Sequence, residues 1–213
     1  MVLRVYYHSL VIVQIENMQV DKNILNEFDS TMKAYCFPMY ERLIQPLEPG
    51  EIINIFNTLG LSDPVLLELY KWRNGIPNQE DLPTNAFRIF PFGVFPPLND
   101  VLQFQELGVS EECWKKSLIS IVASYSGDFL LYESSRKSEN YGMLFLYSPN
   151  LGYVEDVISY YDSVETMLLT IIQCFYEDAL NYINIESGLN IDWDMYFEIS
   201  SKLNPKSDYW KNG

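Results

Sequence analysis

Apolar residues recur at intervals of three and four positions in several segments of the chain, which places them on one face of a helix. Capping residues bound some of these segments. Asp63 and Pro64 suit a helix start, Gly60 suits a helix end, and Asn74-Gly75 suits a left-handed C-terminal stop. The pattern predicts helices at residues 24–35, 52–59, 64–74, 98–107, 110–116, 164–183 and 193–203.

Other segments are rich in Val, Ile, Leu and Tyr without helical spacing, and these predict strands. One lies near the N-terminus, at residues 2–15. Four more follow one another, separated by the turn-forming segments SYSGD, SRKSEN and SPNLG, at residues 117–124, 128–134, 141–148 and 153–161. Four strands at hairpin spacing predict an antiparallel meander, so we expect an α+β fold with helices packed on the sheet.

The predicted helix at 164–183 is the longest. We expect Asp162 and Glu165 to form a D-x-x-E capping box at its start, and the helix to lie across the sheet. No repeat, low-complexity tract or long linker divides the chain. Because a domain averages roughly 150 residues, we expect residues 1–213 to form a single domain.

Charge adds a functional clue to this pattern. The formal net charge is -15, which disfavours nucleic acid and anionic membranes as partners and favours a basic one. Eleven carboxylates lie between Ser138 and Ser201, a stretch without Lys, Arg or His. The alternative is that this acidic surface only confers solubility.

The cysteines and the N-terminus indicate the compartment. Cys36, Cys113 and Cys174 are an odd number at wide spacing, which fits reduced thiols. The N-terminal apolar run is too short to span a bilayer and lacks a cleavage site of small residues. We therefore expect a cytoplasmic protein.

Few catalytic arrangements are compatible with this sequence. His8 is the only histidine, and the common nucleotide-binding and acyl-transfer motifs are missing, so we expect no enzyme, cofactor or metal. Asp192 and Asp194 form a D-x-D that would hold a metal in a transferase or hydrolase, although its place before a helix favours capping. Gly127 and Asp128 are interpreted as a turn before a strand.

The element order, together with the segment LELYKWRNGIP, resembles the SUKH superfamily over about residues 50–180. The resemblance rests on the helix end, two loop aromatics, a strand entry and the segment 141–147; the residues are Trp72, Asn74, Gly75, Phe87, Phe90, Gly127 and Asp128. The glycine-rich run that often precedes this strand in the family is reduced here to one glycine. Residues 1–49 and 186–213 are not covered and are interpreted as extensions.

The resemblance implies a non-enzymatic protein that binds other proteins. Bacterial SUKH members are immunity proteins of polymorphic toxin systems, which neutralise a cognate toxin, and fungal members regulate cell-wall synthesis. We therefore expect an immunity protein that binds a toxin with a basic, nuclease-type surface, with a scaffold or signalling protein as the alternative. The predicted contact residues are the carboxylates and aromatic anchors Glu155, Asp156, Asp162, Glu165, Tyr160 and Tyr161.

Overall fold

The computed structural model describes residues 22–77, 90–91, 93–124, 126–184 and 187–211. Its larger sheet has four antiparallel strands in the order β1-β2-β3-β4: β1 (Leu118–Ala123), β2 (Phe129–Glu133), β3 (Leu144–Ser148) and β4 (Tyr153–Tyr161). The predicted α+β fold with an antiparallel meander is confirmed. The predicted strand at 2–15 and the loop residue Phe87 lie outside the described residues.

Several of the described helices precede this sheet in the chain. They are α2 (Lys22–Tyr35), α3 (Phe37–Tyr40), α4 (Pro49–Leu59), α5 (Pro64–Trp72) and α6 (Leu98–Ser110). Two predicted caps are confirmed. The Asp63 carboxylate accepts the Leu66 N–H at 2.8 Å at the start of α5, and Gly60 ends α4 with φ of 71°. The predicted helical piece at 110–116 is a turn for most of its length, because α6 continues to Ser110 and then stops.

The segment 164–183, predicted as one long helix, is a helix followed by the start of a strand. The helix α7 covers Val164–Tyr176, and the residues after it form β5 (Leu180–Asn184) and β6 (Gly188–Ile191), which pair antiparallel. The helix ends because Asp178 adopts a left-handed conformation with φ of 62°, which short polar residues tolerate. Apolar residues of β5 continued the helical spacing by chance, so the prediction for 177–183 was wrong.

The prediction of the capping box at the start of α7 was also wrong, because the box lies one residue later in the chain, at Ser163 and Thr166. Ser163 accepts the Thr166 N–H at 3.1 Å, and the Thr166 hydroxyl accepts the Ser163 N–H at 3.0 Å. These are the two reciprocal bonds of a capping box. Asp162 and Glu165 therefore have no part in the capping hydrogen bonds, although Glu165 lies in the first turn.

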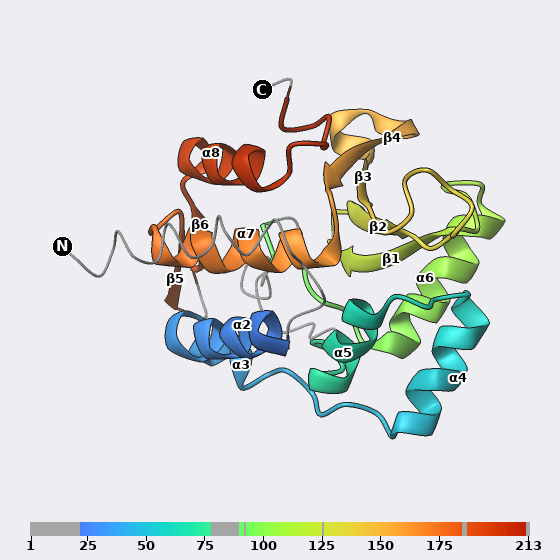
Figure 1. The fold of residues 1–213 in the computed structure, drawn as a ribbon, viewed down its shortest axis with the longest axis horizontal. Coiled ribbons are helices and arrows are strands. Elements are labelled where there is room, and N and C mark those ends of the chain that lie inside the picture. The colour runs from blue at the N-terminus through green and yellow to red at the C-terminus, as the bar shows by residue number, and fades with distance from the viewer. Residues whose placement is uncertain (1–21, 78–89, 92, 125, 185–186, 212–213) are drawn as a thin grey trace.

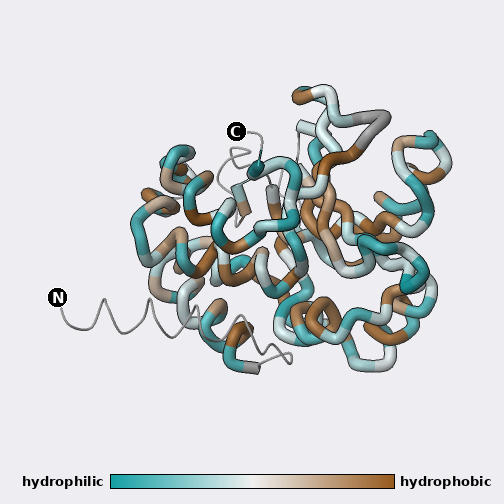
Figure 2. Tube along the Cα trace, turned by 45° about the horizontal axis from the view of Figure 1, so that its top comes forward, coloured by the Kyte–Doolittle hydropathy of each residue, from teal (hydrophilic) through white to brown (hydrophobic). Residues whose placement is uncertain are grey.

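The helix α7 lies between α2 and α8 (Trp193–Leu203) and leads away from the end of β4 instead of crossing the sheet (Figure 1). Along the helices, apolar residues alternate with hydrophilic ones (Figure 2), as expected for helices that bury one face. Buried apolar residues from α2 to Trp210 form one contiguous cluster. The described parts of the two segments that the SUKH resemblance does not cover, residues 22–49 and 187–211, contribute residues to this core.

Candidate functional site

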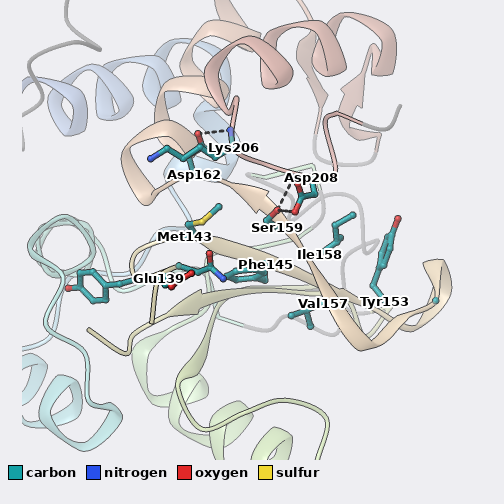
Figure 3. Close-up of a pocket in the computed structure, with 13 residues that line it drawn as sticks. Glu139, Met143, Phe145, Tyr153, Val157, Ile158, Ser159, Asp162, Lys206 and Asp208 are labelled. Carbon is teal, nitrogen blue, oxygen red and sulfur yellow. Dashed lines mark hydrogen bonds between the residues drawn. The ribbon is translucent and has the colours of Figure 1, made fainter. Parts of the chain in front are cut away.

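A hollow of about 750 Å³ opens on the face of the larger sheet, over β3 and β4 (Figure 3). Three parts of the chain line it. The loop before β3 supplies Glu139, Asn140, Tyr141 and Met143. The strands supply residues such as Phe145 and Ser159, and the segment after α8 supplies Lys206 and Asp208. This volume is within the range of ligand-binding pockets in proteins, about 300–1,000 Å³.

Strand geometry explains why the hollow lies there. Phe145 and Tyr147 project from the same face of β3, because side chains alternate along a strand. Trp114 covers Tyr147 and Phe129 on this face, with ring centroids 5.4 and 5.1 Å away. Phe145, which is opposite Ser159 in the β3–β4 register, lies on the same face and lines the hollow.

The segment after α8 forms one wall and is fastened to β4 at Ser159. The Asp208 N–H donates to the Ser159 hydroxyl at 2.8 Å, and that hydroxyl donates to the Asp208 carboxylate at 3.1 Å. The Ser159 carbonyl accepts the Tyr209 N–H at 3.1 Å and the Ser207 hydroxyl at 2.8 Å. Trp210, which is 4% exposed, anchors the segment in the core.

Asp162 lies at the rim, where β4 passes into α7. Its Oδ2 accepts the Lys206 N–H at 3.1 Å, and its own N–H donates to Asn204 Oδ1 at 3.1 Å. Its Oδ1 is buried and has no hydrogen-bond partner. Burial raises the pKa of Asp162, and the backbone N–H groups of Lys206 and Ser207 together with the positive charges of Lys206 and Lys211 offset this only in part.

The charges around the hollow are mainly negative. Three carboxylates line it, from Glu139, Asp162 and Asp208, with one ammonium group from Lys206. Asp208 also pairs with Lys211 at 3.1 Å on the exposed side. Hydrogen bonds from Lys211 and Ser159 lower the pKa of Asp208, so this group stays ionised at neutral pH. Because Lys206 lies in the lining and Lys211 pairs with Asp208, the three carboxylates exceed these two ammonium groups by only one charge.

The predicted partner-binding residues are only partly brought together here. Asp162 lines the hollow, whereas Glu165 lies half-buried in the first turn of α7. The side chains of Glu155 and Asp156 lie outside the described residues. Tyr160 and Tyr161 are both 0% exposed, so the prediction that they anchor a partner was wrong. The β3–β4 register shifts between Ser159 and Tyr161, so the pairing is irregular at Tyr160. The ring of Trp210 packs on the ring of Tyr160, with centroids 4.6 Å apart, and both tyrosine rings lie in the core.

Trp72 and Asn74, two of the residues that carry the family resemblance, make structural contacts. Trp72 packs edge-on against Phe28 at 5.4 Å and donates its Nε1–H to Asp29 at 2.7 Å. Asn74 is buried, and its side-chain oxygen accepts the Leu98 N–H at 2.9 Å at the start of α6. Trp72 therefore anchors one helix end and Asn74 caps the beginning of another.

Gly75 does not stop α5 as expected. The helix ends at Trp72, because Arg73 is already extended with φ of -151°. Gly75 has φ of 76° and lies so close to Phe95 and Pro96 that a Cβ atom would approach the Pro96 carbonyl carbon to 2.4 Å. Its backbone also accepts the Ile44 N–H at 3.0 Å. Glycine is needed here for close backbone approach, which the local sequence does not show.

The Gly127-Asp128 turn has the structural role that we expected. Gly127 has φ of 86°, and the Asp128 carboxylate accepts the Ser126 hydroxyl at 2.6 Å and the Ser148 hydroxyl at 2.5 Å. The turn before β2 is thereby tied to the end of β3. Its polar groups bind one another, which favours the interpretation as a turn.

Asp192 also acts as a helix cap, since its carboxylate accepts the Met195 N–H at 3.1 Å. Within the described ranges, no group of three or more His, Cys, Asp or Glu residues is placed to hold a metal ion. No described helix is both long and apolar enough to cross a membrane.

Sequence reasoning missed Glu139, Ser159, Lys206 and Asp208 as members of one site. They come from a loop, a strand and a C-terminal segment, and no regular spacing along the sequence connects them. A polar serine inside the apolar strand run VISYY was the one local signal. The chain matches no model of a known protein family, and no characterised protein is significantly similar to it in sequence.

Proposed function

We propose that this chain is a non-enzymatic immunity protein of the SUKH type, which binds and neutralises a toxin domain with a basic surface. The observation that carries this proposal is a set of surface carboxylates without positive partners. Glu165, Glu177, Asp178 and Asp194 form no ion pair with any described residue. By contrast, Asp29 on α2 pairs with Lys33, and Glu198 on α8 pairs with Lys202.

These carboxylates lie at the two ends of α7 and at the start of α8. The α7 and α8 helices pack together, and the β5–β6 hairpin connects them. The Asp192 N–H donates to the Ala179 carbonyl at 2.9 Å, so the acids at the end of α7 and those at the start of α8 lie at the same end of the molecule. Glu165 and Asp162 lie at the opposite end of α7. An extended acidic surface of this kind complements a basic protein.

Two further observations support the proposal. The α+β arrangement, with a four-stranded meander, agrees with what the SUKH resemblance implies about the fold. Cys36 and Cys174 are buried free thiols, and burial raises the pKa of Cys36 to about 12, so it is unreactive at neutral pH. Free thiols fit a reducing, cytoplasmic location, where an immunity protein would meet its toxin.

The physical reasoning is that of electrostatic complementarity. A nuclease binds phosphates with lysine and arginine, so an inhibitor that covers its active site benefits from carboxylates at the interface. Long-range attraction then speeds encounter, and this attraction weakens as salt shortens the Debye length from about 30 Å at 0.01 M to about 10 Å at 0.1 M.

The test is to co-express the chain with toxin domains encoded next to its gene and to measure both growth and binding. We expect the chain to restore growth and to bind the toxin with an association rate that falls steeply as salt rises. A variant with Glu165, Glu177 and Asp194 changed to Lys should associate at least about tenfold more slowly at low salt.

The matched control changes the same total charge elsewhere. Glu41 at the end of α3, with Glu48 and Glu51 at the start of α4, are exposed residues outside the basic-free stretch, and their change to Lys should slow association much less. Equal effects of the two triple variants would refute a specific acidic surface. Binding of several non-toxic proteins, without rescue of growth, would instead favour the scaffold alternative.

A further inference from the structure

We propose that the end of the molecule where α7 stops and α8 starts is the surface that contacts the basic toxin, through exposed aromatic and apolar side chains set among carboxylates. This inference rests on the proposed function, because it says which part of the acidic surface the partner covers. The side chains that define this anchor surface are Tyr35, Phe37, Tyr176, Ile183, Trp193 and Met195.

Two helix ends supply the aromatic part of the anchor surface. Tyr35 is the last residue of α2 and Tyr176 is the last residue of α7, and their ring centroids lie 6.0 Å apart. Phe37 begins α3, two residues after Tyr35. The contact between the two tyrosine rings therefore brings segments from opposite ends of the sequence to one place.

The hairpin β5–β6 and the start of α8 supply the rest. Ile183 lies on β5, which follows the end of α7. The Asp192 N–H donates to the Ala179 carbonyl at 2.9 Å, and this bond returns the chain to the end of α7 just before Trp193 and Met195 in the first turn of α8. Figure 1 shows the end of α7, the hairpin and the start of α8 together at the left of the molecule.

Exposed apolar side chains are concentrated at this end. Phe37 is 53% exposed and Trp193 is 49% exposed. Among the described residues, the other large apolar side chains with comparable exposure are single ones on separate elements, at Ile53, Leu107 and Leu151. Scattered apolar residues are ordinary on a protein surface, whereas a group of them marks a site of protein contact. Trp and Tyr also dominate the binding energy of protein interfaces.

The charges at the anchor surface select a basic partner. Glu177 and Asp178 directly follow the last residue of α7, and Asp194 lies in the first turn of α8. None of the three forms an ion pair with a described residue, and Lys33 in the last turn of α2 pairs with Asp29 instead. Lysine and arginine pack on aromatic rings and also pair with carboxylates, so a basic side chain of the partner gains from both kinds of group.

The other acidic end of α7 lacks such anchors. Tyr160 and Tyr161 are fully buried there, and Glu165 is half-buried. Among the described side chains of β4 and the first turn of α7, none is a large exposed apolar one. Of the two ends of α7, the one next to α8 therefore combines negative charge with apolar contact area, which is the combination that a stable protein interface needs.

The test uses the full chain and a short peptide, acetyl-Lys-Leu-Lys-Leu-Lys-amide, which presents basic and apolar side chains together. One comparison peptide has glutamate in place of lysine, and another has serine in place of leucine. NMR signals of the indole N–H groups report binding, and Trp193→Phe identifies the signal of Trp193. We expect the basic, apolar peptide to shift this signal with millimolar affinity and the glutamate peptide to have no effect. The serine peptide should bind at least about fivefold more weakly, because it buries less apolar area.

A double variant tests the anchors themselves. Phe37→Ser combined with Trp193→Ser should weaken binding of the fluorescently labelled peptide at least about fivefold, as fluorescence anisotropy would measure. The matched control combines Leu107→Ser with Leu151→Ser, which removes two apolar side chains of similar exposure, 60% and 52%, on other elements. It should leave binding unchanged. Equal weakening by the two double variants, or weakening by neither, would overturn the anchor surface.

Other occupants of this surface give different results. Thermal unfolding should be nearly the same for the two double variants. A much larger loss of stability for the Phe37 and Trp193 variant would show that the chain itself covers these rings, which overturns the proposal. Dimers of the chain alone in sedimentation, abolished by that variant, would assign the surface to a second copy and overturn it as well.

Failure of this inference and failure of the proposed function are also distinguishable. Salt-dependent toxin binding that the Phe37 and Trp193 variant leaves unchanged would overturn the anchor surface, while the immunity function would remain supported. Specific peptide binding at Trp193, by a chain that rescues no toxin-exposed cell, would support the surface and refute the immunity function.

Discussion

Replacing Gly75 with alanine tests whether this position serves the close approach of two backbone segments. The new Cβ atom would lie 2.4 Å from the Pro96 carbonyl carbon and 2.6 Å from the Phe95 oxygen, which accepts the Ile76 N–H at 2.8 Å. The left-handed backbone costs alanine about 1–2 kcal/mol. Displacing packed atoms costs typically about 1–3 kcal/mol. We therefore expect Gly75→Ala to lower the free energy of unfolding by about 2–5 kcal/mol.

Gly60→Ala is the matched control for this prediction. Gly60 has nearly the same backbone conformation, with φ of 71°, but a methyl group added there would have no atom within 4 Å. It should lose only the conformational part, about 1–2 kcal/mol. Urea denaturation followed by circular dichroism measures both variants. Equal losses for the two glycines would refute the close-approach explanation.

Three other predictions concern side chains around the same core. The pKa of Asp29 lies below its ordinary value, because hydrogen bonds from Lys33, Trp72 and Tyr40 together outweigh partial burial, which alone would raise it. Asp29→Asn should therefore be less stable than the original chain above about pH 4, and the difference should shrink as the pH falls through the folded-state pKa, as urea denaturation at several pH values would show. Ser163→Ala should lower the free energy of unfolding by about 1 kcal/mol and Glu165→Ala should lower it by less, and thermal unfolding measures both. A larger loss for Glu165→Ala would support the Asp162–Glu165 capping box instead. Asn74→Ala leaves the Leu98 N–H without its acceptor and should destabilise the chain by about 1–3 kcal/mol; hydrogen exchange at the start of α6 should rise with it, and unchanged exchange there would contradict the capping role.

The elements that were predicted correctly are those whose signals are local. Asp63 and Pro64 start α5, Gly60 ends α4, and Asp192 caps α8, because a cap is completed within one helical turn. The four-strand meander was recognised from apolar runs separated by turn residues. Its strands pair with sequence neighbours, so the order in the sheet follows the order in the chain.

The predictions that failed depended on distant partners. Residues 180–183 fit a helical pattern, but they form a strand because β6 pairs with them. Tyr160 and Tyr161 look like exposed anchors in an acidic segment until Trp210 and Tyr196 are seen to pack around them. The hollow itself could not be predicted, since its carboxylates come from positions as far apart as 139 and 208.

The sequence by itself determined the α+β class, the order of the meander and the concentration of negative charge between residues 138 and 201, because these follow from composition and from contacts between neighbours in the chain. Only the tertiary structure decided which of these charges share a site. The segment after α8 returns to β4 and places Lys206 beside Asp162 and Asp208 beside Ser159, where hydrogen bonds hold it. Such contacts join residues about fifty positions apart, so they depend on the whole fold and leave no periodic trace in the sequence.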